Sequence, residues 1–377
     1  MLLNIFASIK GIKMSRVCFV LNSFNIGGIE RVIVTLANGL SKKNEVDLLV
    51  LKNSGSLKST LNNNVNTIDL NNLKARFLLP HLLKYLKKYK PDFLVTSIYP
   101  ISIQAVLAIR LAQVKTKLVV THHALFDIEH SGTRFHNFLL KQTLKYFYNK
   151  ADITLAVSKG VYEFLQGIGI KNVRIMYNPI DINEKKKNAE ILQEDISNYK
   201  PYFMFLGRLT PVKNIELIIK SFSELRKNSN FKKYNLLIIG SGPDEEMLKK
   251  LCTELYLNEY CYFLGNKTYP EFYIKNAELV LMASLSEAMP VTVMESFSLD
   301  VPIVTTPARG CLDIFELIDY KYSTTTFDDP IEYAELVKRV LDEKDLICDL
   351  SKKIEDNYGV AKIINLWNDL FVQLKEN

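Results

Sequence analysis

Short runs of apolar, β-branched residues alternate with longer segments of helical periodicity along the chain. In the front half, the apolar runs predict six strands, at 16–22, 46–51, 93–97, 117–121, 153–157 and 173–176. Helical patterns fall between them, at 29–42, 74–90, 101–113, 135–149 and 159–168. Strands that are apolar throughout and separated by helices are typical of a parallel sheet covered on both faces.

A charged stretch after Asp181 interrupts this alternation, which then restarts. The rear half predicts strands at 202–206, 235–240, 260–264, 278–283 and 302–305. Its helical patterns lie at 213–227, 243–256, 269–275, 290–299 and 330–341, and a last one is centred on 363–374. We therefore expect an α/β fold of two Rossmann-like, doubly wound domains facing a central cleft, with ligands at the carboxyl ends of the strands.

Length and composition fit two ordinary globular domains. The chain has 377 residues, of which 48% are hydrophobic and 24% charged. We place a front domain at 1–182, a linker at 183–200, a rear domain at 201–357 and a C-terminal helix, packing back towards the front domain, at 358–377. The five cysteines include no C-x-x-C pair, which favours buried free thiols and a reducing compartment.

The sequence shows no membrane-spanning or secretory pattern. No run of eighteen apolar residues occurs, and residues 1–13 have a short apolar part, two lysines after it and no small-residue cleavage site. We therefore expect a cytoplasmic protein.

Charge is distributed unevenly between the two halves. Residues 1–182 carry 24 Lys and Arg against 10 Asp and Glu, a net charge of +14, and the remainder has a net charge of −7. The segment 74–90 interleaves lysines with Leu and aromatic residues at helical spacing. This pattern fits a helix lying on an anionic membrane and equally an amphipathic helix packed on the sheet. The charge balance favours peripheral contact with the inner face of the cell membrane.

Two glutamates flank the start of a predicted helix in the rear half. Glu287 lies in the loop after a buried strand, and Glu295 lies about a turn and a half into the helix. The free backbone amides at 290–292 favour an anion such as a diphosphate, and the carboxylates would accept strong hydrogen bonds from sugar hydroxyls. The alternative is an acidic residue that stabilises the helix dipole together with a solvent-facing Glu.

Cations and glycines follow the first strand of each half. Arg208 and Lys213 lie on the loop after strand 202–206, where they could neutralise a diphosphate leaving group; a surface charge pair is the alternative. The Gly27-Gly28 pair follows strand 16–22 and permits a close approach of the backbone to a ligand, although a simple turn also accounts for it.

Together these stretches resemble glycosyltransferase family four, whose members have the GT-B fold. The resemblance runs over nearly the whole chain from Met14. It is carried by Gly27-Gly28, Ala156-Val157-Ser158-Lys159, Tyr177-Asn178-Pro179-Ile180-Asp181, Gly207-Arg208-Leu209 with Lys213-Asn214, Ile239-Gly240-Ser241-Gly242-Pro243, Phe263-Leu264-Gly265 and the E-x7-E pair of Glu287 and Glu295.

The resemblance implies a role for each matching residue. Arg208 and Lys213 would bind the donor diphosphate, Glu287 would contact the transferred sugar, and Glu295 would contact the ribose. Further donor contacts would come from the Leu264 turn, from Gly28 and from the backbone amides of Met289, Val291 and Thr292.

A histidine near the reacting carbon is also implied by the family. His123, in Thr121-His122-His123-Ala124, is the better match, with His122 as the fallback and a buried structural histidine as the alternative. Two departures concern the donor sugar: Ala288 stands where many members have Gly, and Asp313 replaces the usual Glu of a Gly-Gly-x-x-Glu-like segment.

The expected activity is retaining transfer of a sugar from a nucleotide-diphosphate donor, with UDP favoured, to a lipid-linked glycan of a bacterial surface polysaccharide such as O-antigen or capsule. Neither a cofactor nor a metal is expected, because no Asp-x-Asp triplet or His/Cys cluster is present. A GT-B sugar-nucleotide epimerase is an alternative. An NAD-dependent oxidoreductase is disfavoured because G-x-G-x-x-G is absent from the front loop, and nucleic-acid binding because no RNA motif or zinc module occurs.

Overall fold

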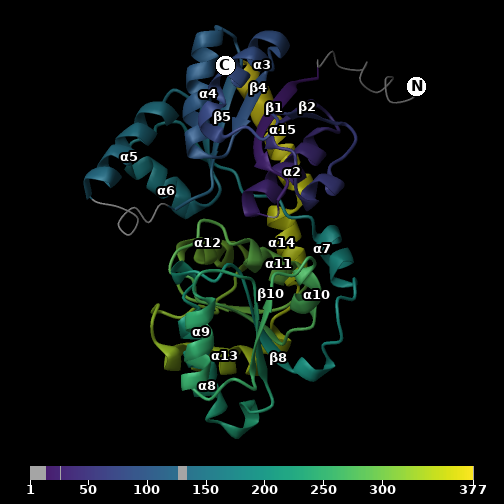
Figure 1. Ribbon diagram of the computed structural model, residues 1–377, viewed down its shortest axis with the longest axis vertical. Coiled ribbons are helices and arrows are strands. Elements are labelled where there is room, and N and C mark those ends of the chain that lie inside the picture. Colours follow the sequence, from purple (N-terminus) through teal and green to yellow (C-terminus); the bar gives the residue numbers. More distant parts are fainter. Residues whose placement is uncertain (1–13, 26, 126–133, 377) are drawn as a thin grey trace.

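The computed structural model of the chain describes residues 14–25, 27–125 and 134–376. Two lobes are stacked along the long axis of the molecule, with the front half above and most of the rear half below (Figure 1). The interpretation of residues 1–13 concerns a segment outside the described residues.

The front lobe is built on a parallel sheet of seven strands in the order β3-β2-β1-β4-β5-β6-β7. The strands are β1 (Arg16–Ser23), β2 (Glu45–Lys52), β3 (Val65–Asp69), β4 (Phe93–Thr96), β5 (Lys117–His122), β6 (Ile153–Ala156) and β7 (Val173–Ile175). The order reverses between β1 and β4, and such a switch point opens a crevice at the carboxyl ends of the strands.

The rear lobe repeats this plan with a parallel sheet of five strands in the order β10-β9-β8-β11-β12. The strands are β8 (Tyr202–Leu206), β9 (Asn235–Ile239), β10 (Cys261–Gly265), β11 (Leu279–Met282) and β12 (Ile303–Thr305). Its switch point lies between β8 and β11. The expected pair of doubly wound α/β domains is confirmed.

Helices connect the strands in both lobes. In the front lobe they are α2 (Gly28–Leu40), α3 (Leu79–Tyr89), α4 (Tyr99–Ala112), α5 (Arg134–Tyr148) and α6 (Lys159–Gly167). Then follow α7 (Ile182–Ala189), α8 (Ile215–Arg226), α9 (Glu245–Glu254), α10 (Pro270–Lys275), α11 (Val291–Ser298), α12 (Arg309–Ile318), α13 (Pro330–Asp342), α14 (Leu350–Tyr358) and α15 (Val360–Glu376). Strand β3 and helices α12 and α14 were not predicted.

The chain crosses between the lobes twice, at neighbouring points. The first crossing follows β7 and leads into α7, and the second joins α14 to α15; Ile180 pairs with Gly359 where they meet. Helix α15 then enters the front lobe, where it packs on α2 (Figure 1). Trp367 is 1% exposed, and the ring of Phe371 stacks on that of Phe93 at 4.3 Å. The last helix is therefore part of the front-lobe core.

The basic segment 74–90 forms a short 3-10 turn and α3, and α3 packs against α4. Its apolar residues Leu82, Tyr85 and Leu86 are buried, and Lys84, Lys87 and Lys88 are exposed. The structure shows the amphipathic helix packed on the fold, and contact of its exposed lysines with a membrane stays a prediction.

Candidate active site

A cleft of about 770 Å³ lies between the two lobes, at the carboxyl ends of both sheets. Six of the predicted site residues line it: Gly28, Arg208, Lys213, Val291, Thr292 and Glu295. Two lengths of chain more than 150 residues apart thus contribute to one cavity. The sequence pattern predicts that these residues converge, and the fold brings them together.

The loop that carries Arg208 is held in place by the neighbouring strand-to-helix turn. Backbone amides of Gly207 and Leu209 donate to the carbonyls of Ile239 and Ser241, both at 3.0 Å. Gly240 has a φ of +133°, and a Cβ there would lie 1.9 Å from the carbonyl oxygen of Gly207. Only glycine allows this approach, so the two loops fix each other at the edge of the cleft.

Arg208 and Lys213 differ in their surroundings. The side chain of Arg208 is exposed and forms no hydrogen bond or ion pair with any residue that the structure describes. The ammonium of Lys213 forms an ion pair with Glu287, and both side chains are largely buried, at 24% and 13% exposure. Glu287 is therefore placed beside Lys213, a cation of the cleft, although it does not itself line the large cleft.

Two helix N-termini meet at the cleft. Helix α11 begins at Val291, after Pro290 as its N-cap, and α2 begins at Gly28. A Cβ on Gly28 would lie 3.7 Å from Cγ2 of Val291, so the starts of the two helices are in close proximity. The first backbone N–H groups of a helix have no partner within it, and the helix dipole adds positive potential there. Together these termini favour an anion.

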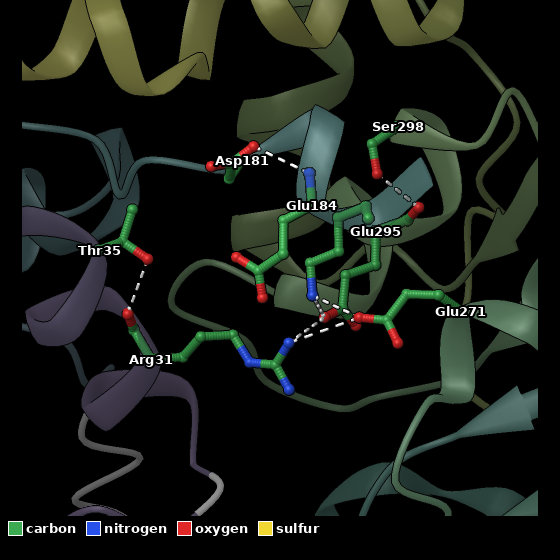
Figure 2. Close-up of polar contacts among 8 residues, drawn as sticks. Arg31, Thr35, Asp181, Glu184, Glu271, Glu295 and Ser298 are labelled. Carbon is green, nitrogen blue, oxygen red and sulfur yellow. Dashed lines mark hydrogen bonds and ion pairs between the residues drawn. The ribbon is translucent and has the colours of Figure 1, made fainter. Parts of the chain in front are cut away.

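Glu295 belongs to a cluster of four charged side chains at the inner end of the cleft. Its Oε1 lies 2.7 Å from Nζ of Lys185, which lies equally close to Oε1 of Glu271. Arg31 of α2 approaches the same two carboxylates at 3.5 and 3.8 Å (Figure 2). Glu295 therefore lines the cleft and at the same time joins the two lobes electrostatically.

The pKa values of Lys185 and Glu271 favour their charged forms. Burial alone would lower the pKa of Lys185, but Glu295 and Glu271 outweigh it, so that the pKa is raised. Burial would likewise raise the pKa of Glu271, but the attraction and hydrogen bond of Lys185 dominate, and the pKa is lowered. We infer that Lys185 is protonated and Glu271 ionised at neutral pH.

His123 lines a different cavity from the cations. This second cavity, of about 10 Å³, also contains Ser97, Met176 and Asn178 and lies inside the front lobe. Nε2 of His123 lies 3.0 Å from Oγ1 of Thr121. Burial, and then the neighbouring His122, lower the pKa of His123 to about 3, so its ring is neutral at pH 7. The structure does not bring His123 into the cleft of Arg208 and Glu295.

His122 is buried against aromatic rings. Its Nδ1 lies 3.2 Å from the hydroxyl oxygen of Tyr148, and its ring stacks on Phe164. Burial lowers the pKa of His122 to about 4. Of the two candidate histidines, only His123 lines the cavity that also reaches Asn178, near the first crossing between the lobes.

Two further predicted donor residues lie beside the large cleft without lining it. Met289 is 8% exposed, and its Sδ accepts a hydrogen bond from the backbone amide of Asn178 at 3.4 Å. Leu264 is partly buried near the end of β10, and the residues that follow it, Asn266 and Lys267, line the cleft instead. This wall of the cleft is therefore made by the loop after β10.

Asp313, which departs from the family pattern, contacts the front lobe. Its Oδ2 accepts a hydrogen bond from the backbone amide of Gly160 at 2.7 Å, and its Oδ1 pairs with Arg309 at 3.1 Å. Burial raises the pKa of Asp313, against the stabilising amide of Gly160. Nearby, a Cβ on Gly310 would lie 2.5 Å from the carbonyl oxygen of Glu287, so glycine is needed where α12 passes the Glu287 loop.

Sequence reasoning missed Arg31, Lys185 and Glu271. Lys185 lies in the run Asn183-Glu-Lys-Lys-Lys187, which is typical of a solvated linker, and Glu271 starts an ordinary short helix. They come together only through contacts between segments 86 to 240 residues apart. No group of three or more His, Cys, Asp or Glu suited to a metal ion occurs among the described residues.

Comparisons with known proteins agree with this architecture. The family model described as "Glycosyltransferase Family 4" matches residues 26–184, and "Glycosyl transferases group 1" matches residues 186–357. A Campylobacter jejuni relative, N-acetylgalactosamine-N,N'-diacetylbacillosaminyl-diphospho-undecaprenol 4-alpha-N-acetylgalactosaminyltransferase, is 28% identical over 314 residues, covering 80% of this chain and 84% of the relative. An Escherichia coli O-antigen biosynthesis glycosyltransferase, WclY, is 25% identical over 371 residues, with 94% and 99% covered.

A solved structure of similar fold is Anabaena HepE in complex with UDP-glucose. It has a TM-score of 0.79 and 16% sequence identity, and the match covers 95% of this chain and all of that one. Its two-domain fold is that of GT-B glycosyltransferases. With both family models side by side along the sequence and the same fold in space, the chain belongs to glycosyltransferase family four and is a glycosyltransferase.

Proposed function

We propose that this protein transfers a sugar from UDP-sugar to a lipid-linked glycan during synthesis of a bacterial surface polysaccharide, with retention of anomeric configuration and without a metal. The observation that carries the proposal is the composition of one cleft. It combines four cations (Arg31, Arg208, Lys213 and Lys267), two helix N-termini and the carboxylate of Glu295, contributed by both lobes.

The cleft suits a nucleoside diphosphate that carries a neutral sugar. Arg208, Lys213 and the first amides of α11 surround a space where two phosphates would be stabilised. Glu295, at the inner end, would accept hydrogen bonds from ribose hydroxyls. HepE, of similar fold, is described in complex with UDP-glucose, which supports the choice of a uridine nucleotide.

In the proposed reaction, the bond between the anomeric carbon and the diphosphate oxygen breaks, and the acceptor hydroxyl forms the new bond on the same face. The leaving diphosphate takes the proton of the incoming hydroxyl. Arg208, Lys213 and the α11 amides stabilise the charge that builds up on the leaving group, which lowers the barrier. None of the front-lobe residues that line the cleft in the described structure is a carboxylate, which favours this front-face route over a covalent glycosyl-enzyme.

The lipid-linked acceptor is proposed from chemistry and relatives. The Campylobacter jejuni relative is named for transfer to a diphospho-undecaprenol glycan. In the front lobe, Phe138, Leu139 and Tyr146 of α5 and Leu111 of α4 are exposed apolar residues on a strongly basic half of the chain. A surface of this kind suits an anionic membrane.

Membrane contact would be peripheral, at the cytoplasmic face. No helix in the described ranges is long and apolar enough to cross a bilayer. Flotation with vesicles, with and without anionic lipid, tests the contact. We expect the wild type to bind anionic vesicles in a salt-sensitive way, and the double variant Phe138→Ser/Leu139→Ser to bind them more weakly. Equal binding by that variant, or none by the wild type, would exclude this surface.

Activity is tested by incubating the protein with a panel of nucleotide sugars and an undecaprenyl-diphosphate-linked glycan. We expect release of UDP and a glycan that is one sugar longer. NMR of the product should show that the α-configuration of the donor is retained. Release of UDP without acceptor, or conversion of the donor sugar to its epimer, would favour the epimerase alternative.

A further inference from the structure

Lys185, Glu271, Glu295 and Arg31 form an ion network at the inner end of the cleft. Of these four residues, only Glu295 is assigned a contact with the donor in the proposed function. Lys185 stands between Glu271 and Glu295, with its Nζ 2.7 Å from one oxygen of each. The three side chains come from three elements, α7, α10 and α11. Arg31, from α2 of the other lobe, points into the same group (Figure 2).

The network is almost completely buried. Lys185 is 3% exposed, the side chains of Glu271 and Glu295 are 1% and 7% exposed, and Arg31 is 21% exposed. Charges are rarely buried to this extent unless they are paired. Two carboxylates that share one cation depend on it, because without it they repel each other and lose their main hydrogen-bond donor.

Lys185 is placed by the crossing between the lobes. Asp181 caps α7 by accepting a hydrogen bond from the backbone amide of Glu184 at 3.0 Å, which starts the helix directly after the first crossing. Helix α7 then packs on α10 and α11. The ammonium group therefore occupies a position fixed by both the crossing and the rear lobe.

We propose that Lys185 is a positioning residue that holds the carboxylate of Glu295 oriented for the donor nucleotide, and that Glu271 serves as the second anchor of its ammonium group. This inference rests on the proposed function, since it assigns Glu295 to the donor. Lys185 itself does not line the cleft of Arg208. It acts through Glu295, and Arg31 adds a second positive charge when the lobes lie as they do here.

The chemical consequence concerns the pH range of donor binding. With Lys185 present, Glu271 stays ionised and its carboxylate takes no proton at neutral pH. With an apolar residue in its place, burial and the adjacent carboxylate would raise the pKa of Glu271. While Glu271 is ionised, the unscreened repulsion would turn the carboxylate of Glu295 away, and hydrogen bonds to the ribose would weaken.

The test compares Lys185→Met with Lys186→Met, a matched control at the next, exposed position of the same helix. Lys185→Met should raise the donor KM by about tenfold or more, the loss expected for one charge-assisted hydrogen bond, with a smaller effect on kcat. Its donor KM should also depend on pH between 6 and 8, where that of the control stays flat.

Two more variants separate positioning from folding. Adding Glu271→Gln to Lys185→Met removes the like charge beside Glu295. The double variant should have a flat pH profile and a donor KM closer to that of the wild type. Lys185→Arg keeps the charge and serves if the methionine variant does not fold. Its bulkier, planar guanidinium does not match the position of a compact ammonium that is 3% exposed, so its donor KM should still rise.

The outcomes are distinguishable from failure of the proposed function. If the wild type shows no UDP binding by calorimetry, the proposed function is wrong. If the wild type binds UDP but both folded Lys185 variants keep a donor KM within twofold of Lys186→Met and a flat pH profile, the inference about Lys185 is overturned.

Discussion

Arg208 provides the sharpest single-residue prediction. Its guanidinium is exposed at the cleft and has no partner among the described residues, whereas Lys213 already pairs with Glu287. Replacing Arg208 by glutamine therefore removes a contact that exists only with bound diphosphate and leaves no unpaired buried charge behind. The variant should lose activity without losing stability.

The magnitude follows from the strength of one charge-assisted hydrogen bond. Such bonds contribute about 1.5–3 kcal/mol, which corresponds to a roughly 10- to 150-fold decrease in kcat/KM for the donor. Surface substitutions without partners usually change the free energy of unfolding by less than about 0.5 kcal/mol. The melting temperature of the free protein should therefore stay within about 2 °C of the wild type.

The assay is initial-rate release of UDP at varied donor concentration, together with calorimetric titration of UDP. Arg339→Gln is the matched control, because Arg339 is an exposed arginine of the same lobe that pairs with Glu343 on the surface. A kcat/KM for Arg208→Gln equal to that of Arg339→Gln would refute the placement of the diphosphate. A large drop in melting temperature would instead show that Arg208 is structural.

Three further expectations concern the scaffold. Gly240→Ala should cost at least about 1–3 kcal/mol of stability from its backbone conformation alone, and its Cβ would also clash with Gly207. Gly167→Ala, with open space around it, is the control. Equal melting temperatures for the two variants would contradict the tight turn at Gly240. Trp367→Ala should lower the free energy of unfolding by about 3–5 kcal/mol, measured by denaturant unfolding, whereas the exposed Val372→Ala should change it little. An equally small change for Trp367→Ala would show that α15 does not belong to the front-lobe core. Burial lowers the pKa of His123 in the folded protein from 6.5 to about 3, so the contribution of its neutral ring to stability is present above pH 6.5 and is lost as the pH falls towards 3. The His123→Gln variant should therefore show a smaller fall in melting temperature between pH 7 and pH 5 than the wild type. A fall equal to that of the wild type would contradict a neutral ring enclosed in the front-lobe cavity.

The fold was largely predictable because its strands are buried on both faces. Continuous apolar runs such as 202–206 are typical of strands buried in this way, and their alternation with helices indicates a parallel sheet. Strand β3 was missed because it is the edge strand, with polar Asn66 and Asp69 in a stretch rich in asparagine. Helix α12 was missed because Gly310 near its start obscures the helical pattern, and that glycine is needed for contact with the Glu287 loop.

The site was predictable only where a motif fixes it locally. Arg208, Lys213 and Gly28 lie in loops or at a helix start just after a strand, and Glu295 lies in the helix that follows β11, so the fold delivers them to one edge. Lys185 had no such signal, since a lysine run is normally solvated and its burial depends on Glu271, far along the chain. His123 follows a strand like the others, yet its ring turns into a front-lobe cavity, because side-chain direction at a strand end is set by packing.

The central claim is that Arg208, Lys213 and the start of α11 surround one diphosphate. A crystal structure with UDP bound tests it most directly. We expect phosphate oxygens within hydrogen-bond distance of Arg208, Lys213 and the amides of Val291 and Thr292, with the ribose at Glu295. A nucleotide bound elsewhere, with these groups still facing solvent, would contradict it.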